Sequence, residues 1–239
     1  EPIQGNCCSI MASVEYVKFV RELCDKYGVL LIIDEVKSGF RVGKGGIQGL
    51  YGVTPDITTF AKAVANGYPI AIVAGSEKVM RTFKYGGAAH GGTYTAHSVS
   101  LAAAKECLRI LDETPALDTL AKYGEKLKLG ISTILGRRGI VHSYTGHSSM
   151  FGLFFASRAP DNYREWKKSD YTFYDRMAYH LHDLGIICEP DSREPWFMCE
   201  AHGKDASCLT DTLKAFEKAV DLTLEDIERD AGPKQNIGG

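Results

Sequence analysis

The chain has 239 residues, of which 44% are hydrophobic and 24% charged, and its formal net charge is −2. This near-neutral balance gives no electrostatic reason to expect nucleic acid or an acidic membrane surface as a partner. No apolar run approaches the roughly 20 residues that a bilayer-spanning helix needs, so we expect neither nucleic acid nor membrane. The length suits one large domain or a domain and a half.

The first part of the chain alternates between helical and strand-like patterns. Apolar residues recur at helical spacing over residues 13–27, and Gly28 follows as a C-cap. Residues 29–33 form a continuous apolar run of strand length, typical of a parallel strand covered on both faces. Residues 55–75 predict strand, loop and strand, and residues 98–111 predict a helix. The alternation predicts an α/β layer with a mainly parallel sheet.

The pattern changes after about residue 112. The expected elements are a helix around 120–134, a strand at 149–155, a helix around 173–184, a short strand at 185–190 and a long helix around 209–227. They indicate a smaller α+β unit. We therefore divide the chain into residues 1–112, part of a large domain, and residues 113–239, a small C-terminal domain. The tail "AGPKQNIGG", residues 231–239, is expected to fray.

Seven cysteines are present, an odd number, without any C-x-x-C or paired Cys/His spacing. We expect free, mostly buried thiols kept reduced, and hence a cytoplasmic protein. The histidines are scattered without ligand spacing, so we expect no metal site. The cysteines are Cys7, Cys8, Cys24, Cys107, Cys188, Cys199 and Cys208.

The candidate chemistry begins in "LLIIDEVKSGFRVG", where Asp34 and Glu35 end the apolar run. Open α/β sheets bind ligands beyond the carboxyl ends of their strands. Lys62 follows 28 residues after Asp34, among apolar neighbours and ahead of a Gly-Tyr-Pro loop. "GGTYTAH", residues 91–97, precedes a predicted helix, and the free N–H groups of a helix N-terminus suit phosphate.

A strand-end aspartate, a lysine and a phosphate-type turn suit pyridoxal phosphate (PLP) chemistry. The lysine amine forms a Schiff base, and a carboxylate beside the pyridine nitrogen keeps that nitrogen protonated, so that the ring accepts electrons. Opposite charges within a few ångströms favour the ionised forms of both groups. The spacing alone also fits a solvated Lys62 with no chemical role.

Several motifs, taken together in their order along the chain, indicate a resemblance to one protein family. "EPIQGN", "LLIIDEVKSGFRVG", "GLYGVTPDITTFAKAVANGYPIAIVAG" and "GGTYTAH" are followed by "SSMFGLFF" and "GIICEPDSREPWFMCEAHG". Together they resemble the class III (ornithine/GABA-type) PLP-dependent aminotransferases of fold type I, with the greatest similarity to the glutamate-1-semialdehyde aminomutases of that family. The resemblance covers nearly the whole chain. It implies the C-terminal part of the large, mainly parallel-sheet domain followed by a small α+β domain.

The resemblance implies a role for each matching residue. Lys62 would form the Schiff base and then move a proton as general base and acid. Asp34 would pair with the pyridine nitrogen, and Val36 would pack on one face of the ring. Asn6 would lie near the phenolic oxygen of the cofactor. Thr93 would reach the phosphate of the neighbouring subunit, which implies a homodimer with shared active sites.

Other matched positions concern the substrate or depart from the family. Glu194 falls where aminomutases keep an active-site glutamate, and Arg193 beside it is a candidate for holding a substrate carboxylate or else a surface arginine. For Glu35 the resemblance implies a structural ion pair or hydrogen bond. Lys37 stands where relatives often have glutamine or methionine, and His97 replaces the usual asparagine of the phosphate turn.

The family's chain is normally much longer, and the portion before "EPIQGN" holds a Ser-Gly-Thr phosphate loop and a ring-stacking aromatic residue. We expect this chain to be the C-terminal part of a longer polypeptide and to need that N-terminal portion. The predicted reaction is amino transfer between an amino acid or amine and an oxo acid or aldehyde. Aminomutase-type intramolecular transfer is the main alternative, and racemases and decarboxylases share the scaffold. A non-catalytic fragment or subunit is the alternative from another class.

Overall fold

The computed structural model describes residues 1–84 and 87–230, so the predicted frayed tail at 231–239 lies outside the described residues. The chain forms two compact units. The first unit comprises residues 1–5 and 10–121, and the second comprises residues 6–9 and the chain from Lys122 onward. The division therefore falls inside one helix, α5 (Ala116–Arg137). The functional division into residues 1–112 and 113–239 stays a prediction.

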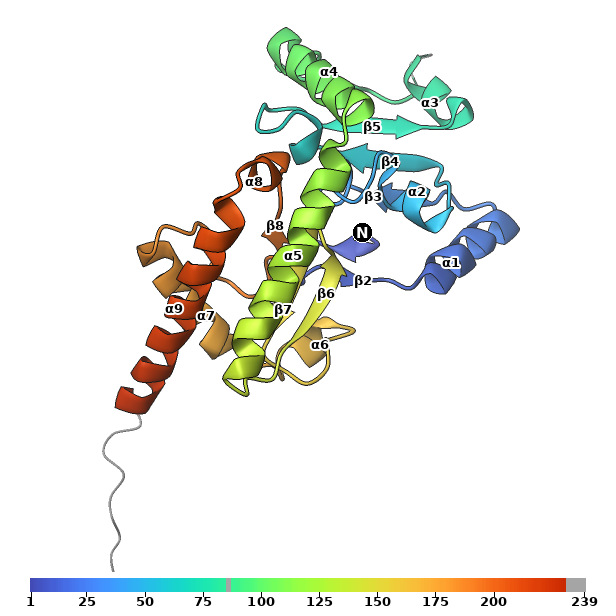
Figure 1. Cartoon of the computed structure of the whole chain (residues 1–239). Helices are drawn as coiled ribbons and strands as arrows, with labels where there is room; N and C mark the ends of the chain where they lie inside the picture. Colours follow the sequence, from blue (N-terminus) through green and yellow to red (C-terminus); the bar gives the residue numbers. More distant parts are fainter. Residues whose placement is uncertain (85–86, 231–239) are drawn as a thin grey trace, which may run out of the picture. The chain divides into compact units, whose positions relative to one another are not determined.

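The first unit contains short strands and helices in alternation (Figure 1). In chain order they are β1 (Ile3–Gln4), β2 (Ile10–Met11), α1 (Val14–Tyr27), β3 (Ile32–Asp34), α2 (Gly46–Tyr51), β4 (Ile57–Phe60), the 3₁₀ turn η1 (Lys62–Val64), β5 (Ile72–Gly75), α3 (Glu77–Lys84) and α4 (Ser98–Glu113). The helices predicted at 13–27 and 98–111, and the strand–loop–strand predicted at 55–75, are confirmed.

Helix α1 ends at the predicted C-cap, and a serine that the sequence analysis did not single out caps its start. The Ser13 side chain accepts a hydrogen bond from the Tyr16 N–H at 3.1 Å, which satisfies one of the unpaired donors of the first turn. Gly28 closes the helix in the left-handed conformation (φ 65°), where a Cβ would be strained.

The sheet of the first unit has the strand order β3-β4-β5. β3 and β4 run parallel, with Asp34 opposite Thr59, whereas β4 and β5 run antiparallel. The antiparallel pair departs from the mainly parallel sheet that we expected. The short connection explains why β5 runs antiparallel to β4. The loop between these strands holds only the η1 turn, and a parallel pair would need a longer crossover connection.

The apolar run at 29–33 is only partly a strand, because β3 begins at Ile32. The expectation that both faces would be covered is wrong for this chain. Val29, Leu30 and Ile32 are 58%, 53% and 57% exposed, whereas Ile33 is buried.

The second unit contains most of α5 and the elements that follow. These are β6 (Ser143–His147), β7 (Met150–Phe154), α6 (Tyr163–Trp166), α7 (Tyr171–Asp183), β8 (Trp196–Phe197), α8 (Glu200–Lys204) and α9 (Cys208–Asp230). The strands form an antiparallel sheet in the order β6-β7-β8. The strand predicted at 185–190 is wrong, since this segment is irregular and Ile187 is 96% exposed.

The second unit has a dense apolar core. All five residues of β7 are buried, and Phe151 stacks on Trp196 of β8 with ring centroids 6.0 Å apart. Phe216 of α9 meets the edge of the Trp196 ring, at 6.2 Å between centroids. Helix α7 packs against α9 and contributes the buried Met177 and Leu181.

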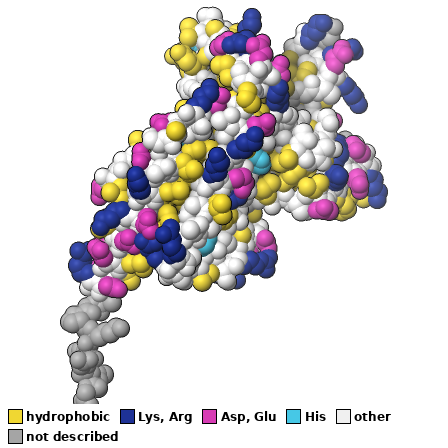
Figure 2. Space-filling model, in the orientation of Figure 1, with side chains coloured by type: hydrophobic (Ala, Val, Ile, Leu, Met, Phe, Trp, Pro, Cys, Tyr) yellow, Lys and Arg dark blue, Asp and Glu magenta, His cyan; other side chains and the backbone are white. Residues whose placement is uncertain are grey.

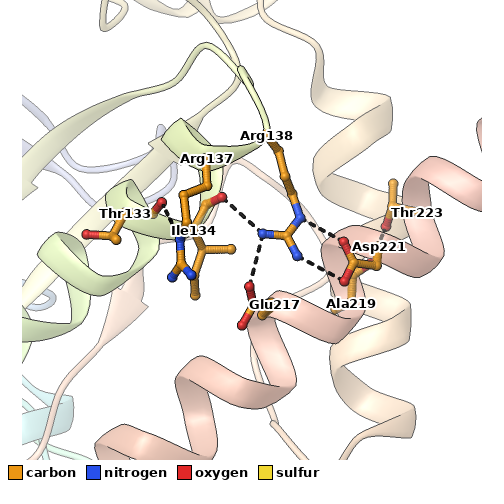
Figure 3. A network of polar contacts seen from close by, with 8 residues as sticks. All are labelled: Thr133, Ile134, Arg137, Arg138, Glu217, Ala219, Asp221 and Thr223. Atoms are coloured by element: carbon orange, nitrogen blue, oxygen red, sulfur yellow. Dashed lines mark hydrogen bonds and ion pairs between the residues drawn. The ribbon is translucent and has the colours of Figure 1, made fainter.

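An arginine joins the last turn of α5 to α9 within this unit (Figure 3). The Arg138 guanidinium donates to both carboxylate oxygens of Asp221 at 2.7 and 2.9 Å, and to Glu217 at 3.1 Å. The same side chain donates to the Ile134 carbonyl oxygen at 3.2 Å, so its planar fork fixes the helix end against α9.

The surface is mixed in charge. Lys and Arg side chains alternate with Asp and Glu over the face that Figure 2 shows, with hydrophobic side chains between them.

Within residues 1–84 and 87–230, no helix combines the length and the apolar character needed to cross a bilayer. All seven cysteines are free thiols, as predicted, but the expectation that most of them are buried is wrong: Cys8 is buried, Cys199 is exposed and the other five are partly exposed.

Candidate active site

Two candidate residues lie at the same edge of the first unit's sheet. Asp34 is the last residue of β3, and Lys62 follows Phe60, the last residue of the neighbouring parallel strand β4, by two positions. The register pairs Asp34 with Thr59. Both side chains are therefore carried at the carboxyl ends of adjacent parallel strands, which is the usual ligand-binding edge of an open α/β sheet.

The strand end that carries Asp34 is fixed by hydrogen bonds. Asp34 Oδ1 accepts the Val36 N–H at 2.9 Å, a local turn that orients the carboxylate. A carboxylate offers two oxygens with about four lone-pair sites, so this bond leaves capacity for a ligand donor. Val36 itself is half-buried beside it.

Glu35 has a structural role that its partners make clear. It is fully buried, and its carboxylate accepts hydrogen bonds from the N–H groups of Ile47 (2.9 Å) and Gln48 (3.3 Å) in the first turn of α2. Ser38 Oγ donates to it at 3.0 Å. Gly46 has φ +56°, and a Cβ there would lie 2.3 Å from Glu35 Oε2. Glu35 thus binds the α2 N-terminus, in line with the structural role that the resemblance implied.

Lys62 has an uncommon backbone conformation. Its φ is +49°, in the left-handed region that non-glycine residues rarely occupy. Strained conformations of this kind cluster at functional sites. The side chain is exposed, whereas the residues after it are anchored: Val64 and Ala65 are buried in a cluster with Ala104 of α4. Cys107 Sγ of the same helix donates to the Ala63 carbonyl oxygen at 3.3 Å. The buried residues that follow Lys62 therefore hold its backbone in a strained conformation, while its side chain is exposed.

Lys37 has a partner that sequence reasoning missed. It is buried, and its ammonium donates to the Gly5 carbonyl oxygen at 3.0 Å. A Cβ on Gly5 would lie 2.0 Å from Lys37 Cδ, so only glycine leaves room for the lysine stem. The two residues are 32 positions apart, and only the fold brings them together. Lys37 thereby holds the chain immediately before Asn6.

The 91–97 turn leads into α4 as expected. Thr95 N–H donates to the Gly92 carbonyl oxygen at 3.0 Å, and His97 N–H donates to that of Tyr94 at 3.1 Å. His97 Nδ1 accepts the Ser100 N–H at 3.4 Å and lies 2.9 Å from Ser100 Oγ, so this histidine caps α4. Thr93 is exposed in the turn.

The remaining candidates, Asn6, Arg193 and Glu194, belong to the second unit. Arg193 Nε donates to both Asp191 oxygens at 2.9 Å, and its guanidinium lies over the Trp166 ring, 5.9 Å from the centroid. The hydrogen bond from Arg193 holds the pKa of Asp191 below its usual range. Glu194 lines a cavity of about 530 Å³.

The sequence did not identify Asp191 as the partner of Arg193, although the short Asp-Ser-Arg spacing is typical of a local side-chain turn. In the part of the chain that the structure describes, no group of three or more His, Cys, Asp or Glu residues is arranged to hold a metal ion.

Comparison with known proteins places these features in a family. The family described as aminotransferase class-III matches residues 1–220. A glutamate-1-semialdehyde 2,1-aminomutase from Neisseria meningitidis is 36% identical over 203 residues, which cover 84% of this chain and 48% of that protein. The chain spans about half the length of the curated relatives that it matches.

Two solved structures share the fold. An omega-transaminase from Sphaerobacter thermophilus has a TM-score of 0.84 at 31% identity, over 94% of this chain and 51% of that one. The FumI protein of a Sphingopyxis species, solved in a PLP internal aldimine form, has a TM-score of 0.80 at 30% identity, over 92% of this chain and 50% of that one. The chain therefore has the fold of the fold type I transaminases, and it belongs to the class-III aminotransferase family.

Proposed function

We propose that this chain is part of a PLP-dependent aminotransferase, which moves an amino group between an amino acid or amine and an oxo acid or aldehyde. The observation that carries the proposal is the placement of Asp34 and Lys62 at the carboxyl ends of two adjacent parallel strands. Family membership and the PLP-bound structures of similar proteins support the choice of cofactor.

The residues at this sheet edge suit the cofactor. A cationic pyridinium N–H needs a carboxylate acceptor, and Asp34 is held at the strand end with one oxygen bonded to the Val36 N–H. A carbonyl group on the cofactor needs an accessible amine, and Lys62 is exposed on a backbone fixed by buried neighbours. When bound, PLP supplies an electron-accepting ring that stabilises negative charge at the substrate α-carbon.

In this proposal each residue has a defined task. The Asp34 carboxylate accepts the hydrogen bond of the pyridine N–H and orients the ring, and Val36 packs on one ring face. Lys62 Nζ binds the cofactor, then takes a proton from the substrate α-carbon and returns one as general acid. Asn6 would lie near the phenolic oxygen and Thr93 near a phosphate. Glu35 acts indirectly, because it fixes the loop that follows Asp34.

The surface of the first unit supports the need for further polypeptide. Helix α1 exposes a stripe of large apolar side chains at helical spacing, and the segment that follows it, residues 29–32, exposes three more. Contiguous apolar surface of this kind normally binds another protein segment. We propose that the N-terminal portion found in longer relatives covers it. The exposed side chains are Tyr16, Phe19, Leu23, Tyr27, Val29, Leu30 and Ile32.

Two further proposals concern assembly and location. The match of Thr93 to the phosphate-turn threonine supports a homodimer with shared sites. The seven free thiols support a reducing, cytoplasmic location.

The reaction can be tested with the intact protein loaded with PLP. An amino donor supplied alone should convert at most one equivalent per site, and an oxo acid or aldehyde should then restore turnover. Continuous turnover of one substrate without an acceptor would instead indicate the aminomutase reaction, which the identity to glutamate-1-semialdehyde 2,1-aminomutases favours as the second candidate. Absence of both reactions, with PLP bound, would leave a non-catalytic subunit.

A further inference from the structure

Helix α4 packs against the turn that carries Lys62, and both belong to the first unit. Ala104 of the helix is buried in one cluster with Val64 and Ala65 of the turn. Cys107 follows Ala104 by three positions, so the two residues share one side of α4. Because these side chains are small, the helix lies close to the backbone of the turn. The residues that follow Lys62 are therefore supported by a single helix.

The turn itself is strained and is closed by long hydrogen bonds. Lys62 (φ +49°) and Asn66 (φ +45°) both have the left-handed backbone conformation, which persists in such residues only where the surrounding structure enforces it. Ala65 N–H donates to the Lys62 carbonyl oxygen at 3.3 Å, and Asn66 N–H donates to that of Ala63 at 3.4 Å. Both distances exceed the usual value of about 2.9 Å, so the bonds within the turn hold it weakly.

Cys107 supplies a hydrogen bond from outside the turn. Its thiol donates to the Ala63 carbonyl oxygen at 3.3 Å, across 44 positions of the sequence. A carbonyl oxygen has two lone pairs, so this one accepts both the thiol and the Asn66 N–H. Burial raises the pKa of Cys107, and the thiol therefore keeps the proton that it donates. A thiol is a weak donor, but here it acts on the residue next to the strained Lys62.

We propose that Cys107 is a positioning residue for Lys62. Its thiol ties the Ala63 carbonyl group to α4 and so holds the Lys62 backbone in the left-handed conformation in which the amine binds the cofactor. That this conformation serves cofactor binding rests on the proposed function, whereas the attachment of the turn to α4 does not. The two parts of the proposal can therefore be measured separately.

Two substitutions separate the hydrogen bond from packing. Cys107→Val keeps a side chain of similar size but has no donor, whereas Cys107→Ser keeps a donor on a smaller side chain. If the bond holds the turn, the valine variant is impaired and the serine variant behaves as the parent does; if packing alone holds it, the order is reversed. Cys107→Ala also has no donor and replaces the valine variant if thermal unfolding shows that the latter does not fold. The matched control is Cys24→Val, at a partly exposed cysteine of α1.

The first measurement is hydrogen exchange of the intact protein without cofactor. The amides of Val64, Ala65 and Asn66 should exchange about two- to fivefold faster in the valine variant, as for the loss of one weak hydrogen bond. The second is borohydride reduction at timed intervals after PLP is added, followed by peptide mapping. The rate at which the Lys62 adduct forms should fall by a similar factor in the valine variant and stay at the parent value in the serine variant. The kcat of amino transfer should fall with it, while the KM for the amino donor stays unchanged.

Several outcomes would overturn the proposal. These are parent-like exchange in the valine variant, equal losses in the valine and serine variants, or the same change in Cys24→Val. Faster exchange without slower adduct formation would show that Cys107 holds the turn but does not position Lys62. A parent protein that forms no Lys62 adduct would instead refute the proposed function, and the exchange rates would still decide whether Cys107 holds the turn.

Discussion

The sheet of the second unit is covered within the chain, whereas the sheet of the first unit leaves apolar side chains at its surface. All five residues of β7 are buried, but in β3 only Ile33 is buried. The first unit, which carries the candidate residue Lys62, thus exposes more of its apolar side chains than the second. If the proposed site is correct, the comparison teaches that the candidate site and the more completely covered core lie in different parts of this chain.

The backbone shows a related difference. The first unit holds non-glycine residues with positive φ at Phe40, Lys62, Asn66 and Ala96, beside the segments that carry the candidate site. In the second unit, among the residues that the structure describes, they are Cys8 and Ser9. Such conformations cost about 1–3 kcal/mol each and persist only where neighbours enforce them. Substitutions in the two units should therefore affect different properties.

The largest effect is expected from Lys62→Ala in the first unit. Loss of the amine should lower the rate of amino transfer at least about 10³-fold, as for removal of a general base. The thermal midpoint should hardly change, because the side chain is exposed and alanine, which also has a Cβ, bears a similar strain in the left-handed conformation of this position. Steady-state kinetics and thermal unfolding measure the two properties. Lys105→Ala, an exposed lysine on α4, is the matched control and should leave both unchanged.

The opposite pattern is expected from Phe216→Ala in the second unit. Phe216 is fully buried and contacts the edge of Trp196, so truncation should lower the free energy of unfolding by about 3–5 kcal/mol. Denaturant unfolding of the intact protein measures this loss. A variant as stable as the parent would contradict the core described here. The borohydride adduct at Lys62 should still form at temperatures where the variant is folded.

A smaller effect is expected from Glu35→Gln. The amide has only one acceptor oxygen, so the N–H groups of Ile47 and Gln48 lose part of their charged acceptor, at a cost of about 1–3 kcal/mol. Hydrogen exchange at these two amides should accelerate. Glu22→Gln on α1, an exposed position, is the control. Unchanged protection at Ile47 and Gln48 would show that Glu35 does not hold the start of α2.

The smallest effect concerns pH and the Arg138 pair of Figure 3. The hydrogen bond from Arg138 lowers the pKa of Asp221, and the folded-state value lies below the unfolded one of about 3.9. The pair therefore stabilises the protein above that pH, and its contribution is lost as pH falls through the folded-state pKa. Asp221→Asn should cost about 0.5–1 kcal/mol at neutral pH, since the pair is partly exposed.

Unfolding curves of parent and Asp221→Asn should converge as the pH falls below about 4. A stability difference that persists in acid would assign the effect to packing rather than to charge. Glu225→Gln on the same helix should show no pH-dependent difference of this size.

Short sequence signals predicted the helices and strands whose ends are determined by residues close in the sequence. Gly28 ends α1 as expected, the helix begins one residue after the predicted start at Ser13, and the apolar spacing of 209–227 lies within α9. The motif around Asp34 indicated a strand that ends on carboxylates, and β3 ends at Asp34. The order of motifs also identified the family.

Features that depend on distant contacts could not be predicted. Nothing in the 185–190 segment distinguishes an apolar irregular segment from a strand, because pairing partners decide between them. The Lys37–Gly5 bond and the exposure of Val29 likewise follow from which segments meet in space. The direction of β5 was set by the short loop before it.

The central claim is that Lys62, carried beside Asp34 at the sheet edge, is the residue that binds the cofactor. Borohydride reduction of the intact, PLP-loaded protein, followed by peptide mapping, tests it most directly. We predict one reduced PLP adduct per chain, located on Lys62 and absent from the Lys62→Ala variant. An adduct on another lysine, such as Lys37, or an unmodified Lys62 in protein that retains amino transfer, would contradict the account.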